Sequence, residues 1–331
     1  MHIPENYLSP STCAVMAAAM LPVWALAIDK VKKEIPREKL PLLGIGAALS
    51  FLGMMFNVPL PGGTTGHAVG GTLLAILFSP WAACLTVSIA LFIQALFFGD
   101  GGLLAFGANA FNMACLLPFS GWLVYSLLKA HKVSEPFAAG IGAYIGINAA
   151  ALAAAIEFGV QPLLFTDAAG QALYCPYPLA VSIPAMMLGH LTLFGLAEVI
   201  FTTAVLGYLR RTSPEFFTAS GAAGSRRSLY GLLGILILGS PLGLLAAGTA
   251  WGEWDAAELA TLDYGGQPLG YTPAGMTDGF SFAALFPDYA VGALPETFGY
   301  LLSAIIGTAL LLILFKLAAS LRGRRVNFDK D

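Results

Sequence analysis

The sequence predicts an all-α polytopic membrane protein. Of its 331 residues, 57% are hydrophobic and only 11% are charged, whereas a soluble domain carries about 25% charged residues. The hydrophobic residues gather in nine apolar runs, and all 16 Lys and Arg residues lie in four segments, three between those runs and one at the end of the last run and beyond it. A chain of this composition has too few polar side chains to cover a water-exposed surface, so we expect its apolar runs to cross a bilayer.

Each apolar run predicts one helix, and most are long enough to cross a hydrocarbon core of about 30 Å. The third helix is the exception, because roughly 13 residues span only about 20 Å. The ten residues before it include two Pro and three Gly, so we expect no helix there and a segment that enters the protein interior. The nine helices are expected near residues 8–29, 40–57, 67–79, 81–98, 106–128, 137–158, 179–209, 228–250 and 296–318.

The positions of Lys and Arg predict the orientation of the chain in the membrane. With the N-terminus outside and the C-terminus inside, every Lys and Arg falls on the inner side, as the positive-inside rule favours. A complete partition of this kind supports the nine-helix topology. The inner segments carry Lys30, Lys32, Lys33, Arg37 and Lys39, then Lys129 and Lys132, then Arg210, Arg211, Arg226 and Arg227, and finally Lys316, Arg322, Arg324, Arg325 and Lys330.

Carboxylates show the opposite distribution, because ten of the 19 Asp and Glu residues lie in the predicted outer connections. Two interpretations remain open. Such a face attracts cations electrostatically, or it merely complements the distribution of Lys and Arg. The ten residues are Glu5, Asp100, Asp167, Glu253, Asp255, Glu258, Asp263, Asp278, Asp288 and Glu296.

The four histidines have different settings. His131 lies beside two Lys residues in a predicted inner connection, where we expect it to be solvated. His190 lies within the seventh helix, two turns before Glu198, and a hydrogen bond between helices is its expected role. The alternative is that His190 and Glu198 form the site of a membrane-embedded metal-dependent enzyme. The remaining two histidines are His2 and His67.

The position of His2 next to Met1 predicts a metal chelator. The α-amine of Met1, the amide nitrogen of His2 and the His2 ring nitrogen Nδ1 close two fused chelate rings on one ion. Their three nitrogens are nearly coplanar and leave one in-plane position open. An all-nitrogen plane suits Ni(II) or Cu(II) and is poor for Zn, Mg or Ca. Because the amide must lose its proton, we expect metal binding to strengthen as the pH rises.

His67 is the candidate for the fourth nitrogen. It follows Gly62-Gly63-Thr64-Thr65-Gly66 at the start of the short third helix, on the same predicted outer side as Met1. Glycines let two backbones approach closely, so the N-terminal tail has room to enter this loop. The alternative is a purely structural role, which is common for a lone His in an apolar region but leaves the position of His2 unexplained.

Two motifs resemble a known family. The opening MHIPENYLSP is similar to the MHIPDGFLSP opening of CbiM/NikM proteins, the substrate-binding components of energy-coupling-factor (ECF) cobalt and nickel transporters. The second similarity runs from Asn57-Val-Pro-Leu-Pro-Gly-Gly-Thr-Thr-Gly-His67 to Gly70-Gly71. It continues with Phe98-Gly-Asp-Gly-Gly-Leu-Leu-Ala-Phe-Gly-Ala-Asn109 and Asn112-Met113. The resemblance covers roughly residues 1–210.

The resemblance implies a seven-helix substrate component that holds its metal in a square plane of four nitrogens. Carried onto this sequence, these are the Met1 amine, the amide and the ring of His2, and the ring of His67. Glu5-Asn6-Tyr7 departs from the Asp-Gly-Phe that is common in the family, which leaves the four donors intact and concerns how the tail packs. Candidates for supporting contacts around the ligands are Asn57, Thr64 and Thr65.

Residues 228–331 resemble a second component of the same transporters. Two predicted helices bracket an outer loop, residues 251–295, which is similar to the two-helix CbiN/NikN component and its PDGLE-type segment. The loop reads Thr-Asp-Gly-Phe where Pro-Asp-Gly is typical. We therefore expect a fused NikMN-type chain, with a metal-binding part at 1–210, a cytoplasmic linker at 211–227 and a CbiN/NikN-like part at 228–331. The alternative is two additional anchoring helices.

The resemblance also implies partners. The sequence has no GxxxxGK[ST] motif, so the chain is not expected to hold ATP phosphates itself. A CbiQ/NikQ-like transmembrane coupling subunit and a CbiO/NikO-like cytoplasmic ATPase are expected in a bacterial or archaeal cytoplasmic membrane. We expect a transporter subunit surrounded by membrane lipid, with Ni2+ or Co2+ as its transported ligand, no cofactor and no nucleic-acid partner.

The nature of the ion and two other functional classes stay open. A planar nitrogen field and the fused architecture favour Ni2+, and cobalt uptake for cobalamin synthesis is the alternative. An enzyme built on His190 and Glu198 is disfavoured, because no HExxH or GxSxG motif occurs. A passive channel is disfavoured as well, since an all-nitrogen chelate binds too tightly for rapid conduction.

Overall fold

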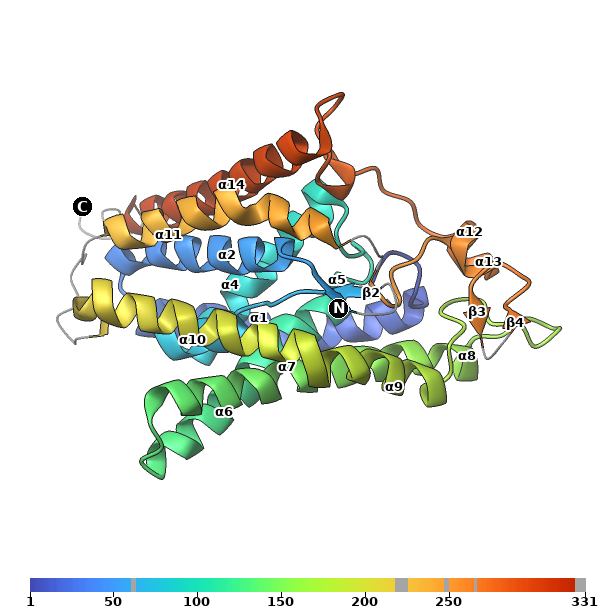
Figure 1. Ribbon diagram of the computed structural model, residues 1–331, viewed down its shortest axis with the longest axis horizontal. Coiled ribbons are helices and arrows are strands. Elements are labelled where there is room, and N and C mark those ends of the chain that lie inside the picture. Colours follow the sequence, from blue (N-terminus) through green and yellow to red (C-terminus); the bar gives the residue numbers. More distant parts are fainter. Residues whose placement is uncertain (61–63, 218–225, 247–249, 265–266, 325–331) are drawn as a thin grey trace.

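Long apolar helices, arranged roughly along one axis, make up most of the protein (Figure 1). The computed structural model describes residues 1–60, 64–217, 226–246, 250–264 and 267–324. The long helices are α1 (Pro10–Glu34), α2 (Leu40–Met55), α4 (Pro80–Ile93), α6 (Leu117–Ala130), α7 (Glu135–Gly159), α9 (Leu179–Gly189), α10 (Gly195–Thr212), α11 (Arg226–Gly239) and α14 (Glu296–Arg324).

Three π-helical turns extend or join these helices. One extends α4 (Gln94–Phe98), one leads into α6 (Ala110–Leu116), and one joins α9 to α10 (His190–Phe194). With these turns included, the described part of the chain contains eight helical segments that are long and apolar enough to cross a membrane. The prediction of an all-α polytopic membrane protein is therefore confirmed.

The first residues of the helices explain where they begin. Ser9 precedes α1, and its hydroxyl accepts a hydrogen bond from the amide of Thr12 at 3.1 Å, while Pro10 occupies the first helical position. Ser79 caps α4 in the same way, again followed by a proline. Such caps satisfy amides that have no partner within the helix. The start of α1 also determines where the preceding tail enters the molecule.

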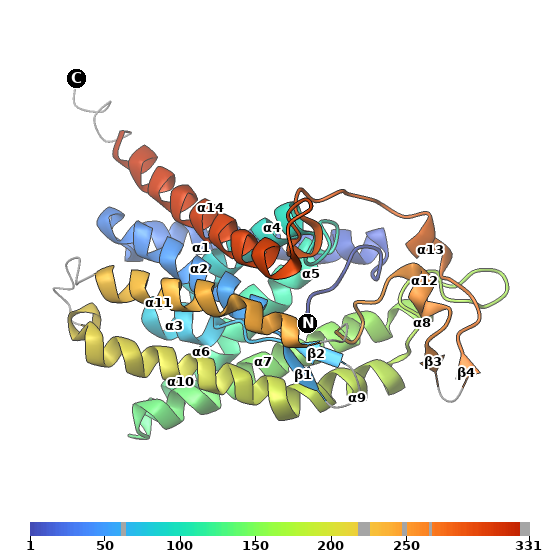
Figure 2. The same ribbon diagram turned by 45° about the horizontal axis from the view of Figure 1, so that its top comes forward.

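The centre of the bundle is α2, in which every residue except Pro41 is buried. It packs against α4, and also against α11 and α14 from the C-terminal part of the chain (Figure 2). By contrast, α1 exposes large apolar side chains such as Val15 and Leu21, as expected of a helix that faces lipid. The two C-terminal helices are thus packed against the buried helix of the first part.

The expected irregularity around the third helix is confirmed, but the helix starts later than predicted. The helix α3 (Gly71–Leu77) has seven residues, about 10 Å, and residues 67–70 before it are not helical. Gly70 adopts a left-handed conformation with φ of 74° and turns the chain into α3. The Pro- and Gly-rich segment forms an antiparallel pair of strands, β1 (Val58–Leu60) and β2 (Thr64–Gly66).

Where the structure describes them, the long connections at one end of the bundle carry short elements. A loop at residues 251–295, the C-terminal loop, joins α11 to α14 and covers the end where α8 lies (Figure 1). Strands β3 and β4 of this loop pair antiparallel. The short elements of the C-terminal loop are α12 (Ala256–Leu259), β3 (Asp263–Tyr264), β4 (Gln267–Pro268) and α13 (Ala274–Thr277). Two other short helices belong to membrane-spanning segments: α5 (Phe106–Asn109) begins the segment that ends with α6, and α8 (Gln161–Leu164) ends the segment of α7.

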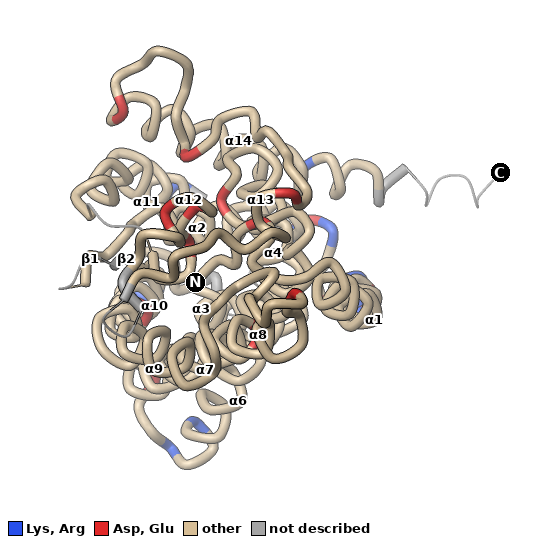
Figure 3. Tube along the Cα trace, turned by 90° about the vertical axis from the view of Figure 1, so that its right-hand side faces the viewer, with Lys and Arg blue, Asp and Glu red and all other residues tan. Residues whose placement is uncertain are grey.

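Charged residues divide between the two ends of the bundle. The connections after α1, α6 and α10, and the end of α14, lie at the end opposite the C-terminal loop (Figure 1), and these are the segments that carry Lys and Arg. Viewed onto the other end, Asp and Glu residues surround the N-terminus (Figure 3). At the basic end, Arg210 on α10 forms an ion pair with Glu135 at the start of α7. Arg325 and Lys330 lie outside the described residues.

Candidate metal site

The N-terminus lies inside the bundle, beside β2 (Figures 1 and 2). Met1 and His2 are each only 3% exposed, and Ile3 is fully buried. We call residues 1–9 the N-terminal tail. A chain end buried to this extent needs specific contacts to offset the loss of hydration around its polar groups.

The two histidines singled out in the sequence meet at the buried end of the tail. His2 Nδ1 lies 3.1 Å from His67 Nε2, and the ring centroids are 4.8 Å apart. The other ring nitrogen of His67 faces the carbonyl oxygen of Ala68 at 3.3 Å. Burial, followed by the positive charge of the N-terminus and smaller effects of His2 and His190, lowers the pKa of His67 well below its usual value. A neutral His67 ring has a free lone pair, which a metal ligand requires.

Asn109 and Gly102 hold the backbone of the tail. The Asn109 side chain accepts a hydrogen bond from the amide of Ile3 at 2.7 Å and donates one to the Ile3 carbonyl at 3.0 Å. The same carbonyl accepts a hydrogen bond from the amide of Gly102 at 2.9 Å. A Cβ atom at position 102 would lie 2.8 Å from the backbone nitrogen of Glu5, so only glycine permits this approach. Hydrogen bonds therefore hold both the amide and the carbonyl of Ile3, the residue next to His2.

Glu5 makes a further contact with the same loop. Its carboxylate accepts hydrogen bonds from the amides of Leu103 at 2.8 Å and Leu104 at 3.2 Å. Burial raises the pKa of Glu5, and the hydrogen bonds from the two amides oppose that effect. The tail is thus anchored against residues 101–104. Gly62 and Gly63, which were predicted to make room for the tail, lie outside the residues that the structure describes.

The residues that depart from the family's usual opening contact the C-terminal loop. Asn6 has a left-handed backbone, with φ of 63°, and its side chain donates to the carbonyl of Phe280 at 2.9 Å and accepts from the amide of Phe280 at 3.1 Å. The hydroxyl of Tyr7 donates to the carbonyl of Trp254 at 2.7 Å. The residues that depart from the family's opening thus pack the tail against the C-terminal loop.

The C-terminal loop also reaches the candidate ligands. The Met1 amine lies 3.2 Å from a carboxylate oxygen of Glu253. The hydroxyl of Tyr289 donates to Asp100 at 2.5 Å, and the other oxygen of Asp100 lies 3.1 Å from His2 Nδ1. Two carboxylates therefore face the first two residues. Glu253 of the C-terminal loop faces Met1, and Asp100, which the loop contacts through Tyr289, faces His2.

Glu198 holds the loop that carries His67. Its carboxyl group, fully buried on α10, accepts hydrogen bonds from the amide of Val69 at 2.7 Å and from the amide of Gly70 at 3.0 Å. The hydroxyl of Ser50 on α2 donates to the carbonyl of Val69 at 2.7 Å. These contacts fix the backbone two and three residues beyond His67.

The prediction that His190 forms a hydrogen bond with another helix is wrong. Its Nδ1 lies 2.8 Å from the carbonyl oxygen of Met186, one turn earlier in the same helix, so it makes no hydrogen bond between helices among the described residues. Glu198 is engaged with backbone amides, so these two residues do not form the pair that the enzyme alternative required. His131 is exposed, as expected.

The candidates for supporting contacts are only partly placed. Thr65 is 7% exposed and lines a small cavity with Met1, and the side chain of Thr64 lies outside the described residues. Among the described residues, no hydrogen bond joins the side chain of Asn57 or Thr65 to His2 or His67. These three residues remain predictions.

Sequence reasoning missed Asp100, Asn109 and Glu253. Asp100 and Asn109 lie in the motif Phe98–Asn109, which supported the family resemblance, but neither residue was assigned a role. Their polar side chains within a Gly-rich motif could have identified them as candidates. Glu253 was noted only as one of ten outer carboxylates. Its contact with Met1 joins residues 252 positions apart, and no local pattern predicts it.

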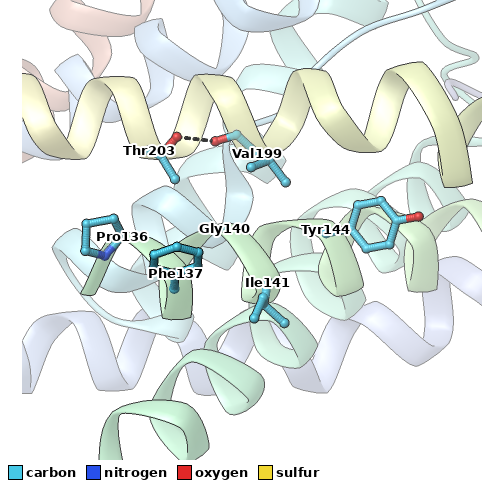
Figure 4. Close-up of a pocket in the computed structure, with 7 residues that line it drawn as sticks. All are labelled: Pro136, Phe137, Gly140, Ile141, Tyr144, Val199 and Thr203. Atoms are coloured by element: carbon cyan, nitrogen blue, oxygen red, sulfur yellow. Dashed lines mark hydrogen bonds between the residues drawn. The ribbon is translucent and has the colours of Figure 1, made fainter. Parts of the chain in front are cut away.

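A larger cavity lies elsewhere, on the flank between α7 and α10 (Figure 4). Its volume is about 430 Å³, and Pro136, Phe137, Ile141 and Val199 give it a largely apolar lining. None of its seven lining residues carries a charge or an imidazole, so it lacks the donors of a transition-metal site. In the described part of the chain, no three His, Cys, Asp or Glu side chains cluster as a ligand set.

Comparisons with known proteins agree with the resemblance seen in the motifs. Residues 2–216 match the CbiM family, described as the cobalt uptake substrate-specific transmembrane region, and residues 225–324 match the PDGLE domain. The chain is 52% identical over 320 residues to the probable fused nickel transport protein LarMN of Lactiplantibacillus plantarum, covering 96% of this chain and 97% of that protein. It is 46% identical over 340 residues to the fused nickel transport protein NikMN of Rhodobacter capsulatus, covering 97% and 98%.

A solved structure extends the comparison to three dimensions. The crystal structure of a truncated transition metal transporter is 56% identical in sequence, with a TM-score of 0.62, and covers 64% of this chain and 99% of that one. The family and these relatives are metal transport proteins rather than enzymes. The chain belongs to the CbiM/NikM family of metal uptake proteins, in the fused form that carries a PDGLE domain at its C-terminal end.

Proposed function

We propose that this protein captures Ni2+, or alternatively Co2+, with the Met1 amine, the His2 amide, the His2 ring and the His67 ring. The observation that carries the proposal is the meeting of His2 Nδ1 and His67 Nε2 at 3.1 Å beside a buried N-terminus. These donors come from the first two residues and one loop, and they form one site because Asn109 and Gly102 dock the tail.

The separation of the two ring nitrogens fits a shared ion. Two nitrogens bound at about 2.0–2.1 Å and a right angle lie roughly 2.9 Å apart. In the proposed plane, the Met1 amine and His2 Nδ1 lie opposite each other, so His67 Nε2 is a neighbour of His2 Nδ1. The measured 3.1 Å is close to this value.

Replacing His2 or His67 by Ala tests the ligand set. In the full chain with its N-terminus unblocked, we expect each variant to lose Ni2+ affinity by more than about 100-fold, because a direct ligand counts for more than the supporting groups whose loss costs 10–100-fold. Equilibrium dialysis with metal analysis measures the stoichiometry. His131→Ala, at an exposed position, is the matched control and should bind like the wild type. Stoichiometric, tight binding by either ligand variant would refute the site.

The affinity should rise with pH. Binding must displace the protons of the α-ammonium and of the His2 amide, so their release favours the complex at higher pH. His67 contributes no proton of its own, because burial keeps its pKa low and its ring neutral. Titrations of Ni2+ in buffers of different ionisation enthalpy count the protons released. A pH-independent affinity between pH 6 and about 9 would contradict a chelate that includes the backbone amide.

The proposed donor set supports Ni2+ as the transported ion. A square-planar nitrogen field favours Ni2+ over most divalent ions, and both fused relatives described above are named as nickel transport proteins. Cobalt remains the second candidate, because the CbiM family is described by cobalt uptake. Competition between the two ions for the purified protein distinguishes them.

Uptake against a gradient requires partners and an orientation. We include in the proposal a CbiQ/NikQ-like coupling subunit and a CbiO/NikO-like ATPase, which together make this chain the substrate-specific subunit of an ECF transporter. The N-terminus is assigned to the outside and the C-terminus to the inside of a cytoplasmic membrane. The gathering of Lys- and Arg-bearing connections at one end of the bundle supports that assignment.

The chain divides, in our proposal, into a metal-binding part (1–210), a cytoplasmic linker (211–227) and a CbiN/NikN-like part (228–331). The C-terminal loop of the last part helps to load the ion onto the tail. Contacts of Glu253 with Met1 and of Tyr289 with Asp100 support this role, because they link the loop to both N-terminal residues. Asn57, Thr64 and Thr65 are retained as supporting residues around the ligands.

A further inference from the structure

The apolar cavity between α7 and α10 extends through about one leaflet of a membrane. Pro136 and Phe137, in the first turn of α7, border one end of it, and Tyr144 borders the other end (Figure 4). Residues 136–144 span about 12 Å at 1.5 Å per residue, whereas the hydrocarbon core is about 30 Å thick. The cavity therefore runs from the basic end of the bundle, where α7 begins, toward the middle of the membrane.

The cavity is a groove with a floor and one closed end. Gly140 forms the floor, since a Cβ atom there would lie 3.3 Å from Val199 Cγ1 and 3.5 Å from Thr203 Cγ2 on α10. Tyr144 closes the end near the middle of the membrane, because its hydroxyl donates a hydrogen bond to the carbonyl of Leu191 at 2.7 Å and so joins α7 to the turn before α10. An occupant of the groove would therefore enter from the basic end or from the side.

The walls of the groove are apolar and turned outward. On α7, Phe137 is 71% exposed and Ile141 is 45% exposed, and on α10 the neighbour of Val199, Ile200, is 65% exposed. Exposed apolar patches of this kind mark contacts with lipid or with a partner. A membrane-spanning helix of a partner would need a groove along the whole bundle, whereas this one ends at Tyr144. Its length fits a single acyl chain of one leaflet.

The basic end of the groove is positively charged. The chain on either side of it, at residues 129–135 and 210–217, carries four Lys and Arg against two Glu: Lys129, Lys132, Arg210, Arg211, Glu135 and Glu215. Arg210 forms an ion pair with Glu135. Arg211 and Lys132 are exposed, and neither forms an ion pair among the described residues. A basic pocket between helices at a membrane surface is a typical site for an anionic lipid headgroup.

We propose that this groove binds one acyl chain of an anionic phospholipid, whose phosphate headgroup contacts Arg211 and Lys132. Lipid tails are as apolar as the groove, so the groove contributes shape and the two cations contribute the preference for negative charge. Thr203 fits this role because its hydroxyl donates to the carbonyl of Val199 at 2.7 Å and needs no polar occupant. The lipid site is separate from the proposed metal site and requires only the leaflet at the basic end, whichever side of the membrane that is.

Native mass spectrometry of the full chain in detergent tests the headgroup preference. The probes are phosphatidylglycerol and phosphatidylcholine with identical palmitoyl and oleoyl chains. The wild type should bind one phosphatidylglycerol more than about 10-fold more tightly, because each Lys or Arg near a membrane surface contributes about fivefold. Arg211→Gln and Lys132→Gln should each lose about fivefold for phosphatidylglycerol and nothing for phosphatidylcholine. Lys30→Gln, at an exposed position of α1, is the matched control and should resemble the wild type.

A substitution that fills the groove tests its location. Thr203→Phe should abolish the preference for phosphatidylglycerol. Thr192→Phe is the matched control, since its hydroxyl also donates to the carbonyl four residues earlier, at 2.6 Å, and it does not line the groove. In the wild type, phosphatidylglycerol with a photoreactive acyl chain should label residues 136–144 and 199–203 more strongly than α1, which also exposes apolar side chains.

Three outcomes would overturn the proposal. Equal affinity of the wild type for the two lipids would remove the role of the cations, and labelling spread evenly over α1 and the groove would remove the site. Both are measured on the wild type and decide the question even if a variant fails to fold. The third is a Thr203→Phe variant that keeps the lipid preference but no longer assembles with a coupling subunit, which would assign the groove to a partner helix.

Discussion

Two residues added ahead of Met1 are expected to abolish high-affinity binding of Ni2+. The addition changes no side chain, but it turns the Met1 amine into an amide and moves the free amine two residues away, so the amine no longer closes a chelate ring with the His2 amide. Because Met1 is 3% exposed, the extra residues also have no room at the buried end of the tail. We expect the affinity to fall by more than about 100-fold, beyond the effect of losing a supporting group.

Calorimetric titration of the extended chain measures this loss, and the control restores the terminus. When a specific protease removes the two added residues, binding should return to the wild-type value. The same two residues added after Asp331 should have no effect. Wild-type affinity in the uncleaved chain would show that the Met1 amine is not a ligand, whatever the histidines do.

Composition and charge were enough to predict most of the bundle. The apolar runs placed the long helices because a membrane-spanning helix must be apolar along its whole length. The start of the third helix was predicted too early, at His67 rather than Gly71. Apolar composition cannot distinguish a helix from an extended segment that is buried in protein, and Val69 and Gly70 satisfy their amides with Glu198 instead of with a helical turn.

The candidate ligands were predictable, whereas their supports were not. Met1 and His2 are neighbours in the chain, so the chelate follows from covalent structure, and His67 stood out as a lone imidazole in a Gly-rich loop. The contacts of Asn109 with Ile3 and of Glu253 with Met1 depend on packing between segments more than 100 positions apart. Likewise, the sequence does not show that His190 Nδ1 contacts the carbonyl of Met186 or that Nε2 is buried without a hydrogen-bond partner.

Replacing Glu198 by Ala is expected to destabilise the fold and weaken the metal site together. The change removes the acceptor of the Val69 and Gly70 amides, and each buried amide left without a partner costs about 1–3 kcal/mol. We therefore expect the free energy of unfolding to fall by about 3–5 kcal/mol. His67 lies two residues before Val69, so its ring should lose its fixed position, and Ni2+ affinity should fall about 10- to 100-fold.

Two further variants distinguish an effect on the position of His67 from an effect on the stability of the whole fold. Glu198→Gln keeps an oxygen where both amides bind, since both reach the same carboxyl oxygen, at 2.7 and 3.0 Å; we expect it to cost only about 1–2 kcal/mol and to restore most of the affinity. Glu157→Ala removes another buried carboxyl group, whose recorded side-chain hydrogen bond is to Asn112, and should lower stability while leaving Ni2+ affinity unchanged. Thermal unfolding and metal titration in the same detergent measure both quantities. If Glu157→Ala weakened Ni2+ binding as much as Glu198→Ala, the loss would reflect general destabilisation, and Glu198 would have no particular part in positioning His67.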